Sequence, residues 1–150
     1  MVLERFEIRK ADNDDLEEIC AIEEISFSQD LYPSFLIEKL IQDSHSIFLV
    51  LTDSNGNIRG YCVAKVENQR AHLVSLAVVP SHRRSGLATV LLKALFSALV
   101  DKDVREVTLE VRTDNSGAIE LYSRFGFALE STVRQYYSDG SDGLRMKKPV

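Results

Sequence analysis

The sequence predicts one α/β domain, in which a mixed, mostly antiparallel central sheet is flanked by helices. Segments with strand periodicity alternate with segments with helical periodicity, and this alternation is typical of α/β and α+β folds. The chain has 150 residues, which is long enough to bury a core without metal ions or disulfides. Because no repeat, low-complexity tract or linker interrupts it, we expect residues 1–150 to form a single domain.

The first half of the chain predicts a strand, two helices and then three strands. Asp12 is a favourable N-cap for the first helix, and the acidic residues that follow it interact well with the helix dipole. Asn55-Gly56 is typical of a tight hairpin turn. The predicted elements are a strand over residues 3–10, a helix from Asp12 to about Phe27, a loop over residues 28–33, a short helix carrying Phe35 to Ile41, and strands over residues 46–52, 58–67 and 71–79.

The second half predicts two helices and three strands. Apolar residues recur at helical spacing from Leu87 to Leu99, and Gly126 suits the position just after a helix because glycine adopts the left-handed backbone conformation. The predicted elements are a polar loop over residues 80–86, a helix from Leu87 to Leu99, a strand over residues 104–112, a short helix capped by Thr113 or Asp114 and ending at Phe125-Gly126, and strands over residues 127–137 and 144–148. The predicted order is therefore β-α-α-β-β-β-α-β-α-β-β.

Composition and charge exclude several classes of protein. The net charge of −5 argues against general binding to nucleic acid. The two cysteines, Cys20 and Cys62, are too few for a disulfide scaffold or a cysteine-rich zinc module, and no ligand spacing predicts another metal site. No apolar run approaches the ~20 residues of a membrane span, and the N-terminal segment MVLERFEIRK lacks the apolar core of a signal peptide. We therefore expect a cytoplasmic protein with no membrane partner.

A strand, a basic loop and a helix N-terminus follow one another in residues 73–89. The first N–H groups of a helix have no partner within it, and the helix dipole makes that end positive. Arg83 and Arg84 add positive charge, and Gly86 allows a ligand to approach the backbone closely. The segment therefore predicts a phosphate or pyrophosphate site. The alternative is a solvated loop in which Ser85 is an ordinary N-cap.

The order of short motifs resembles that of the GCN5-related N-acetyltransferases (GNAT family). Arg83-x-x-Gly86-x-Ala88 matches the R/Q-x-x-G-x-G/A signature of that family. The other matching segments are Ser75-Leu-Ala-Val78, Leu109-Glu-Val-Arg112, Asn115-x-x-Ala118-x-x-Leu-Tyr122, Phe125-Gly-Phe127 and the tail from Tyr136-Tyr137 to Met146-Lys147. The tail makes the resemblance closest to RimI-type enzymes and to archaeal and NatA-type protein N-terminal acetyltransferases. It implies acetyl-CoA as the donor and a protein or peptide N-terminus as the acceptor.

The resemblance also implies roles for individual residues. Glu110 would be the general base, Tyr122 the general acid beside the thioester sulfur, and His72 would help to hold a water molecule that carries the proton. The expected acetyl-CoA contacts are the strand residues Leu76, Ala77 and Val78, the loop and helix residues Arg83, Arg84, Ser85, Gly86, Leu87, Ala88 and Thr89, and the residues Asn115 and Tyr122 near the reactive end.

The resemblance also implies that the acceptor peptide enters between the loop joining the first two helices and the final hairpin. Phe27, Tyr32, Tyr136 and Tyr137 are the candidates for lining the pocket of the first peptide residue, because aromatic rings supply large contact areas and tyrosine adds a hydroxyl. The alternative is that these side chains pack the loops together. The segment from Phe27 to Pro33 departs from the Leu-Pro-Glu-Asn-Tyr stretch of NatA-type enzymes, so the preference for the first residue stays open.

The expected chemistry is direct attack of a neutral amine on the thioester. The pKa of a free α-amine is ~7.7–8.0, against ~10.4 for lysine, so an α-amine needs only modest help from a carboxylate acting through water. No covalent intermediate is required, so no catalytic cysteine is expected. Two other functions stay open: acetylation of lysine side chains or small amines by the same fold, and a non-catalytic acetyl-CoA-binding module. An auxiliary subunit or a homo-oligomer also stays open.

Each candidate residue has an ordinary structural interpretation as well. Glu110 could face solvent from an edge of the sheet, and His72 could be a surface or capping residue. Tyr122 could belong to the core, and Asn115 could be only a helix cap. Among the other polar residues, Arg112 is predicted to be structural rather than catalytic, and no partner is predicted for His45 or His82.

Overall fold

A computed structural model describes residues 4–27 and 29–150 of the protein. The strands are β1 (Glu7–Lys10), β2 (Ser46–Thr52), β3 (Ile58–Glu67), β4 (Arg70–Val78), β5 (Glu106–Arg112), β6 (Ala128–Val133) and β7 (Gly143–Pro149). The α-helices are α1 (Leu16–Ser26), α2 (Ser34–Gln42), α3 (Leu87–Val100) and α4 (Ser116–Phe125). One-turn 3-10 helices at Asn13–Asp15 and Pro80–His82 precede α1 and α3. The predicted order of strands and α-helices is confirmed.

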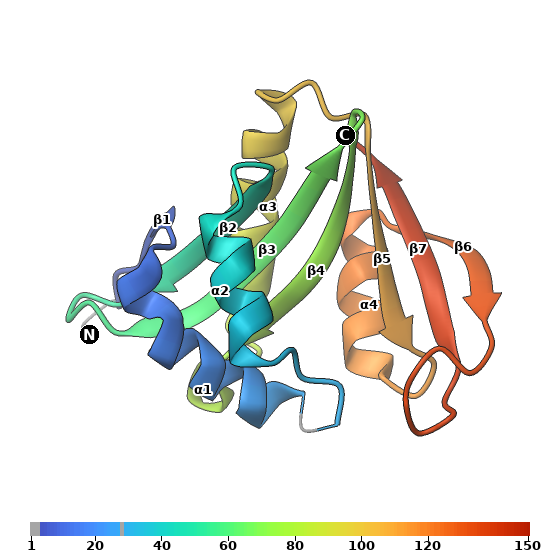
Figure 1. Ribbon diagram of the computed structural model, residues 1–150, viewed down its shortest axis with the longest axis horizontal. Coiled ribbons are helices and arrows are strands. Elements are labelled where there is room, and N and C mark those ends of the chain that lie inside the picture. The colour runs from blue at the N-terminus through green and yellow to red at the C-terminus, as the bar shows by residue number, and fades with distance from the viewer. Residues whose placement is uncertain (1–3, 28) are drawn as a thin grey trace.

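A seven-stranded sheet with the order β1-β2-β3-β4-β5-β7-β6 forms the centre of the molecule (Figure 1). β4 and β5 run parallel, and the other neighbouring strands are antiparallel. The prediction of a mixed, mostly antiparallel sheet flanked by helices is therefore confirmed. β2 and β3 have the predicted bounds, because the apolar character of the strands and the turn at Asn55-Gly56 between them are both local signals.

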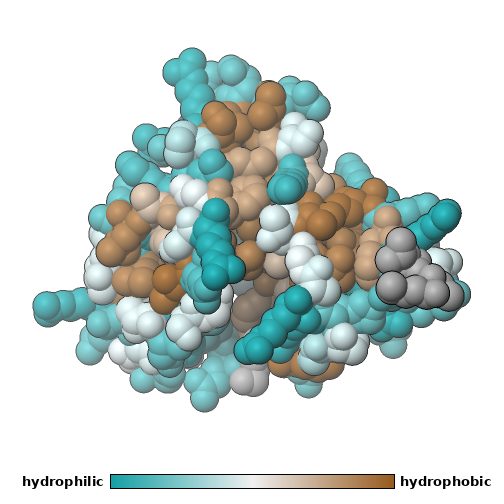
Figure 2. Space-filling view, turned by 180° about the vertical axis from the view of Figure 1, so that it is seen from behind, coloured by the Kyte–Doolittle hydropathy of each residue, from teal (hydrophilic) through white to brown (hydrophobic). Residues whose placement is uncertain are grey.

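Helices cover both faces of the sheet. α1 and α2 lie on one face, where Ile19 and Tyr61 are almost completely buried (Figure 1). α3 and α4 lie on the other face, and Leu91, Leu95 and Leu99 of α3 pack there with no exposed surface. Seen from behind, the molecule has patches of hydrophobic surface, separated and bordered by polar side chains (Figure 2). The regular apolar stripe of α3 is thus explained by its position against the sheet.

The parallel strands β4 and β5 are paired over only a short part of their length. Arg70, Ala71 and His72 of β4 pair with Glu106, Val107 and Thr108 of β5, and beyond these positions the two strands separate (Figure 1). The register between β3 and β4 also shifts within this region, between Val63 and Ala64. Because β3 occupies one edge of β4, the other edge after His72 has no strand partner among the described residues. Its backbone N–H and C=O groups are available to a ligand.

The final hairpin differs from the predicted one. β6 ends at Val133, whereas the sequence predicted a strand that reached Tyr137. Gln135 has a positive φ of 52°, and its N–H donates a hydrogen bond to the side chain of Asp142 at 2.9 Å, so the backbone leaves the ladder. Tyr136 and Tyr137 therefore lie in the loop between β6 and β7, not in a strand.

The caps of two helices also differ from the predicted ones. α4 is capped by Asn115, whose side chain accepts a hydrogen bond from the N–H of Ala118 at 3.2 Å, and not by Thr113 or Asp114. Asp12 caps a 3-10 turn that leads into α1, rather than the α-helix itself. Leu3 of the predicted first strand and Ser28 of the predicted loop lie outside the described residues.

Candidate active site

A cavity of about 650 Å³ opens where β4 and β5 separate. Its wall contains residues of α1, β4, α3, β5 and α4 and of the loops after α1 and β6. The predicted site residues in this wall are Phe27, Tyr32, His72, Leu76, Ala77, Val78, Arg83, Arg84, Gly86, Leu87, Ala88, Thr89, Glu110, Asn115, Tyr122, Tyr136 and Tyr137. Ser85 does not line the cavity, because its hydroxyl turns back to donate a hydrogen bond to the carbonyl of His82.

His72 on β4 and Glu110 on β5 meet where the two strands begin to separate. The Nε2 atom of His72 shares a hydrogen bond with Oε2 of Glu110. The other carboxylate oxygen, Oε1, accepts hydrogen bonds from Nε and Nη2 of Arg145 at 3.2 and 3.1 Å. The bond to His72 is the largest cause that lowers the pKa of Glu110 below its usual value, and Arg145 adds to the effect, while burial opposes it. Glu110 is therefore an ionised carboxylate near neutral pH.

The ionised carboxylate of Glu110 determines which tautomer of neutral His72 is stable. A carboxylate only accepts hydrogen bonds, so Nε2 of His72 carries the hydrogen and Nδ1 keeps a free lone pair. The side chain of His72 is 39% exposed, so water can reach the ring. The pair can therefore take up a proton and stabilise the resulting positive charge against the carboxylate.

Tyr122 on α4 combines a buried ring with a hydroxyl that keeps its proton. The ring packs edge-to-face against Phe127, with 5.6 Å between the centroids. Burial is the largest cause that raises the pKa of Tyr122 above its usual value, and no hydrogen bond from another described residue contributes to the shift. Because Tyr122 lines the cavity, its hydroxyl can donate a hydrogen bond or a proton to a bound group.

The N-terminus of α3 presents to the cavity backbone N–H groups that have no hydrogen-bond acceptor among the described residues. Gly86 is the N-cap with a φ of +83°, and a Cβ atom there would meet nothing within 4 Å. The first bond of the helix runs from the N–H of Val90 to the carbonyl of Gly86 at 3.1 Å, so the N–H groups of residues 87–89 precede it. Arg84 lies beside them. The alternative in which Ser85 is the N-cap is wrong, because Gly86 holds that position.

Arg83 has a second attachment that the sequence did not predict. Its Nε donates a hydrogen bond to the carbonyl of Val78 at 2.9 Å, and its Nη2 donates one to the hydroxyl of Ser26 at 3.3 Å. These bonds fix the loop against the end of β4 and the end of α1. The guanidinium still has N–H groups to offer an anion in the cavity, since five donors are present and two are used.

Three tyrosines surround Glu110 at the opposite end of the cavity. Burial is the largest cause that raises the pKa of Tyr32, Tyr136 and Tyr137, and the negative charge of Glu110 contributes to each shift. The rings of Tyr136 and Tyr137 also contact each other edge-to-face, with centroids 4.9 Å apart. These predicted acceptor residues therefore gather around the carboxylate that is the candidate base.

Sequence reasoning missed Glu23, a carboxylate in the cavity wall that is 2% exposed. Its Oε1 accepts hydrogen bonds from the hydroxyls of Tyr61 and Ser75, and its Oε2 accepts one from the backbone N–H of Tyr32 at 3.0 Å. Glu23 lies one helical turn after the buried Ile19, and that spacing is the signal that places it on the inner face of α1. Sequence reasoning also missed Arg145, because its place in the site follows only from its hydrogen bonds to Glu110 in the folded structure.

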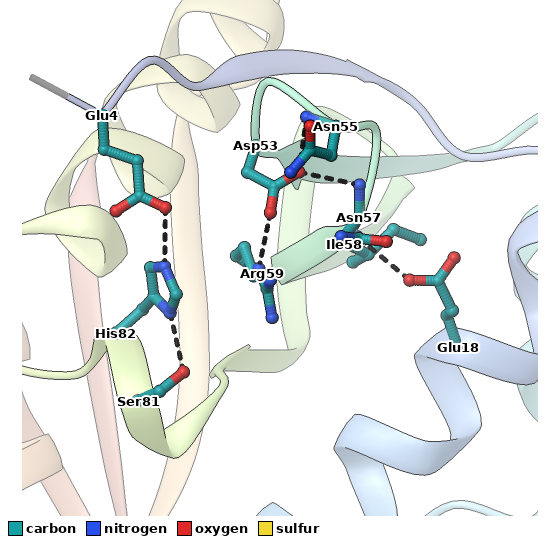
Figure 3. A network of polar contacts seen from close by, with 9 residues as sticks. All are labelled: Glu4, Glu18, Asp53, Asn55, Asn57, Ile58, Arg59, Ser81 and His82. Atoms are coloured by element: carbon teal, nitrogen blue, oxygen red, sulfur yellow. Dashed lines mark hydrogen bonds and ion pairs between the residues drawn. The ribbon is translucent and has the colours of Figure 1, made fainter. Parts of the chain in front are cut away.

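His82 has partners, contrary to the prediction. Its Nε2 lies 2.9 Å from the carboxylate of Glu4, and its Nδ1 lies 2.8 Å from the hydroxyl of Ser81 (Figure 3). The ring also packs edge-to-face against Phe6, with centroids 5.9 Å apart. These contacts hold the N-terminal segment against the loop that leads to α3. The imidazole of His45 has no hydrogen bond to another described residue. Its backbone N–H donates a hydrogen bond to the side chain of Asp43.

Two further findings concern metal ions and membranes. Within residues 4–27 and 29–150, no group of three or more His, Cys, Asp and Glu side chains is placed to hold a metal ion. In the same part of the chain, no helix has the length and apolar character that crossing a membrane requires.

Comparison with known proteins identifies the family. The model of the acetyltransferase (GNAT) family matches residues 10–127, which is more than half of the chain. The chain belongs to this family. An N-alpha-acetyltransferase of Sulfurisphaera tokodaii is 31% identical over an alignment of 158 positions that covers 97% of this chain and 93% of that protein. The resemblance to GNAT enzymes that the motifs indicated is thereby confirmed.

Two solved structures of GNAT proteins have the same fold. Ard1 from Thermoplasma volcanium superposes with a TM-score of 0.90 at 30% identity, and the match covers 97% of each chain. The ribosomal-protein-S18-alanine N-acetyltransferase from Escherichia coli superposes with a TM-score of 0.85 at 28% identity, covering 97% of this chain and 94% of that one. The similarity in fold to these two enzymes, one archaeal and one of the RimI type, thus extends over nearly the whole of this chain.

The cavity of this GNAT chain has the parts that acetyl-CoA requires. The open space at Gly86 and the unpaired N–H groups at the start of α3 fit a pyrophosphate. The unpaired edge of β4 fits the amide groups of an extended pantetheine arm. The cavity volume of about 650 Å³ also lies within the range of ~300–1,000 Å³ that small-molecule sites occupy.

Proposed function

We propose that this protein transfers the acetyl group of acetyl-CoA to the N-terminal α-amine of proteins or peptides. The observation that carries the proposal is a single cavity whose wall holds both the His72–Glu110 pair and the N-terminus of α3. It is supported by relatives that are named as an N-alpha-acetyltransferase and as a ribosomal-protein-S18-alanine N-acetyltransferase.

In this proposal the donor occupies the side of the cavity made by β4 and α3. Acetyl-CoA supplies an activated thioester when it is bound. The N–H groups of residues 87–89 and the guanidinium of Arg84 bind its pyrophosphate, and the free edge of Leu76 and Ala77 aligns its arm. The side-chain oxygen of Asn115 is used as the cap of α4, so its amide NH₂ is the part that can reach the donor.

The His72–Glu110 pair receives the proton of the acceptor amine. A free α-amine has a pKa of ~7.7–8.0, so a base acting through one water molecule is sufficient near neutral pH. The lowered pKa of Glu110 makes its carboxylate a weak base on its own, so Nδ1 of His72 takes the proton and Glu110 stabilises the imidazolium. Glu110 and His72 thus act as one unit.

The hydroxyl of Tyr122 assists the departure of the CoA thiolate. A thiol has a pKa of ~8.5, and the raised pKa of Tyr122 ensures that the hydroxyl is protonated when it is needed. A thiol nucleophile from the protein has no part in the scheme. Cys62 is completely buried with its pKa raised to about 12 by burial, and Cys20 does not line the cavity. Both substrates are therefore bound together when the amine attacks.

The acceptor end of the cavity favours a cationic amine beside aromatic rings. Of the carboxylates in its wall, Asp30 and Glu110 are paired with Arg112 and Arg145. Glu23 has no cationic partner among the described residues, so its negative charge attracts an α-ammonium group before that group loses its proton. Tyr32 and Tyr137 add hydroxyls that can bond to the peptide backbone.

The proposal is tested by measuring CoA release from acetyl-CoA with a panel of peptides. One set has free N-termini and varies the first residue, and a matched set has blocked N-termini and one internal lysine. We expect turnover with the first set only, and a fall in kcat of about 10²–10⁴-fold in Glu110→Gln. Arg124→Gln, which removes an exposed ion pair on the outer side of α4, is the control that retains activity.

Other outcomes would replace the proposal. Turnover with the blocked lysine peptides would make the protein a lysine acetyltransferase, and turnover with small amines alone would make it an enzyme for that class. Binding of acetyl-CoA without turnover of any amine, unchanged in Glu110→Gln, would leave a non-catalytic binding module.

A further inference from the structure

One guanidinium joins two loops at the acceptor end of the cavity. Arg112, the last residue of β5, donates hydrogen bonds to Asp30 from Nε at 2.5 Å and from Nη2 at 3.0 Å. Its Nη1 donates a third to Asp139 at 3.0 Å. Asp30 belongs to the loop between α1 and α2, and Asp139 belongs to the loop between β6 and β7. We call Arg112, Asp30 and Asp139 the loop clasp.

The loop clasp is packed and partly shielded from solvent. The guanidinium carbon of Arg112 lies 4.5 Å from the centroid of the Tyr137 ring, which is a cation–π arrangement. The side chains of Arg112 and Asp30 are 18% and 21% exposed, so salt screens this ion pair less than a surface pair. The backbone N–H of Ser141 and then the guanidinium of Arg112 lower the pKa of Asp139 to about 2.

Both clasped loops carry the aromatic wall of the acceptor end. Tyr32 follows Asp30 in the first loop, and Tyr136 and Tyr137 precede Asp139 in the second, and all three line the cavity. The first loop is also tied to α1 through Glu23, which accepts the N–H of Tyr32. The position of the second loop relative to the first therefore depends on Arg112.

We infer that Arg112 is a positioning residue that sets the distance between the two acceptor-side loops, and with it the fit of the acceptor. The inference rests on the proposed function. The donor side, which β4 and α3 form, contains neither loop, so the binding of acetyl-CoA does not depend on Arg112. Lysine cannot replace it, because an ammonium group lacks the planar fork that bonds Asp30 twice while a third N–H reaches Asp139.

The test compares Arg112→Gln and Arg112→Lys with a matched control, Arg9→Gln. Arg9 forms a pair of similar geometry with the buried Asp15, at 2.7 and 2.8 Å, and neither residue lines the cavity. Peptide KM and kcat, the Kd of acetyl-CoA and the melting temperature are measured for each protein. We expect both Arg112 variants to raise the peptide KM about tenfold or more and to change the Kd of acetyl-CoA less than about twofold. Arg9→Gln lowers the melting temperature without raising the peptide KM.

Hydrogen–deuterium exchange provides a readout that does not depend on catalysis. Arg112→Gln is expected to increase exchange in residues 29–33 and 134–142 together, whereas Arg9→Gln leaves both segments unchanged. If peptides are not substrates but both segments respond, the loop clasp stands and the proposed function fails. If Arg112→Gln does not fold, Asp139→Asn removes one clasp bond, and a smaller rise in peptide KM is expected. A peptide KM that stays unchanged in the folded variants, or rises only in step with the Kd of acetyl-CoA, would overturn the inference.

Discussion

Arg145 on β7 donates two hydrogen bonds to the same oxygen of Glu110, from Nε at 3.2 Å and from Nη2 at 3.1 Å. With His72 on its other oxygen, the Glu110 carboxylate is fixed between two donors that come from different strands. This arrangement explains why its pKa lies below the usual value of 4.5 even though its side chain is only 10% exposed.

Replacing Arg145 with methionine should raise the pKa of Glu110, because the positive charge and the two hydrogen bonds that Arg145 gives to the carboxylate are removed. The sign follows from linkage: a carboxylate with a lowered pKa stabilises the fold above its unfolded pKa, and this contribution disappears as the pH falls through the folded pKa. The stability of Arg145→Met should therefore fall less steeply with acid than that of the wild type. A carbon-13 NMR titration of the Glu110 carboxyl measures the shift directly, and Arg124→Met is the control. An unchanged titration midpoint would show that His72 alone sets the pKa.

Tyr122→Phe and Tyr61→Phe remove the same atom from two buried tyrosines, and we expect opposite effects. The Tyr61 hydroxyl donates a hydrogen bond to Glu23, so its loss should lower the free energy of unfolding by about 1–3 kcal/mol. The Tyr122 hydroxyl has no such bond in the described chain, so its loss should leave stability nearly unchanged and lower kcat by about 10²–10⁴-fold. Urea unfolding and steady-state kinetics separate the two cases. Full activity in Tyr122→Phe would assign the role of acid to water.

Gly86→Ala should weaken acetyl-CoA binding, and Gly56→Ala should not. The two glycines have nearly the same φ, +83° and +82°, and a Cβ at either position would meet nothing within 4 Å. Each substitution should therefore cost about 1–2 kcal/mol of stability from left-handed backbone strain alone. Only Gly86 lies in the cavity wall, at the start of α3. Calorimetry with acetyl-CoA should show a higher Kd for Gly86→Ala alone. Equal values of Kd in both variants would place the pyrophosphate elsewhere.

Thiol labelling should distinguish Cys20 from Cys62. Cys62 has no exposed surface and a pKa raised to about 12 by burial, so it should not react with iodoacetamide while the protein is folded. Cys20 is partly exposed on α1, and burial raises its pKa, so it should react slowly. Mass spectrometry should find one label on the native protein and two after denaturation. Cys20→Ser should abolish the native label, and a label on Cys62 in the folded state would contradict the structure.

Local signals in the sequence account for most of the fold. The bounds of β2 and β3 are predicted because Asn55-Gly56 fixes their turn and each strand is a mostly apolar run that is buried on both faces of the sheet. The end of β6 is not predicted, because Gln135 leaves the ladder to bond with Asp142, a partner on the far side of the turn. The sequence allowed Asn115 to be either a helix cap or a residue of the site, and the structure shows that it is both. Its side chain caps α4 and also lines the cavity.

Some residues of the candidate site can be predicted from sequence motifs, and others are found only from contacts in the folded structure. The order of the motifs allowed residues as far apart as His72 and Tyr122 to be assigned to one site, and the structure places them in one cavity. Glu23 and Arg145 could not be assigned in this way. Their importance comes from contacts through space, with Ser75 and Glu110 respectively. The spacing from Ile19 indicates only that Glu23 lies on the inner face of α1, and no local pattern distinguishes Arg145 from a surface charge.

The parallel ladder between β4 and β5 spans three residue pairs, fewer than any other ladder between described strands. It is a seam between two half-sheets, and bending there breaks fewer backbone hydrogen bonds than bending elsewhere. A donor that contacts β4 on one side and α4 on the other ties the half-sheets together across this seam. At a concentration a hundredfold above its Kd, such a ligand stabilises the folded state by about 2.7 kcal/mol. In the proposed function, an occupied donor site would therefore hold the two half-sheets together more firmly than the three-pair ladder does alone.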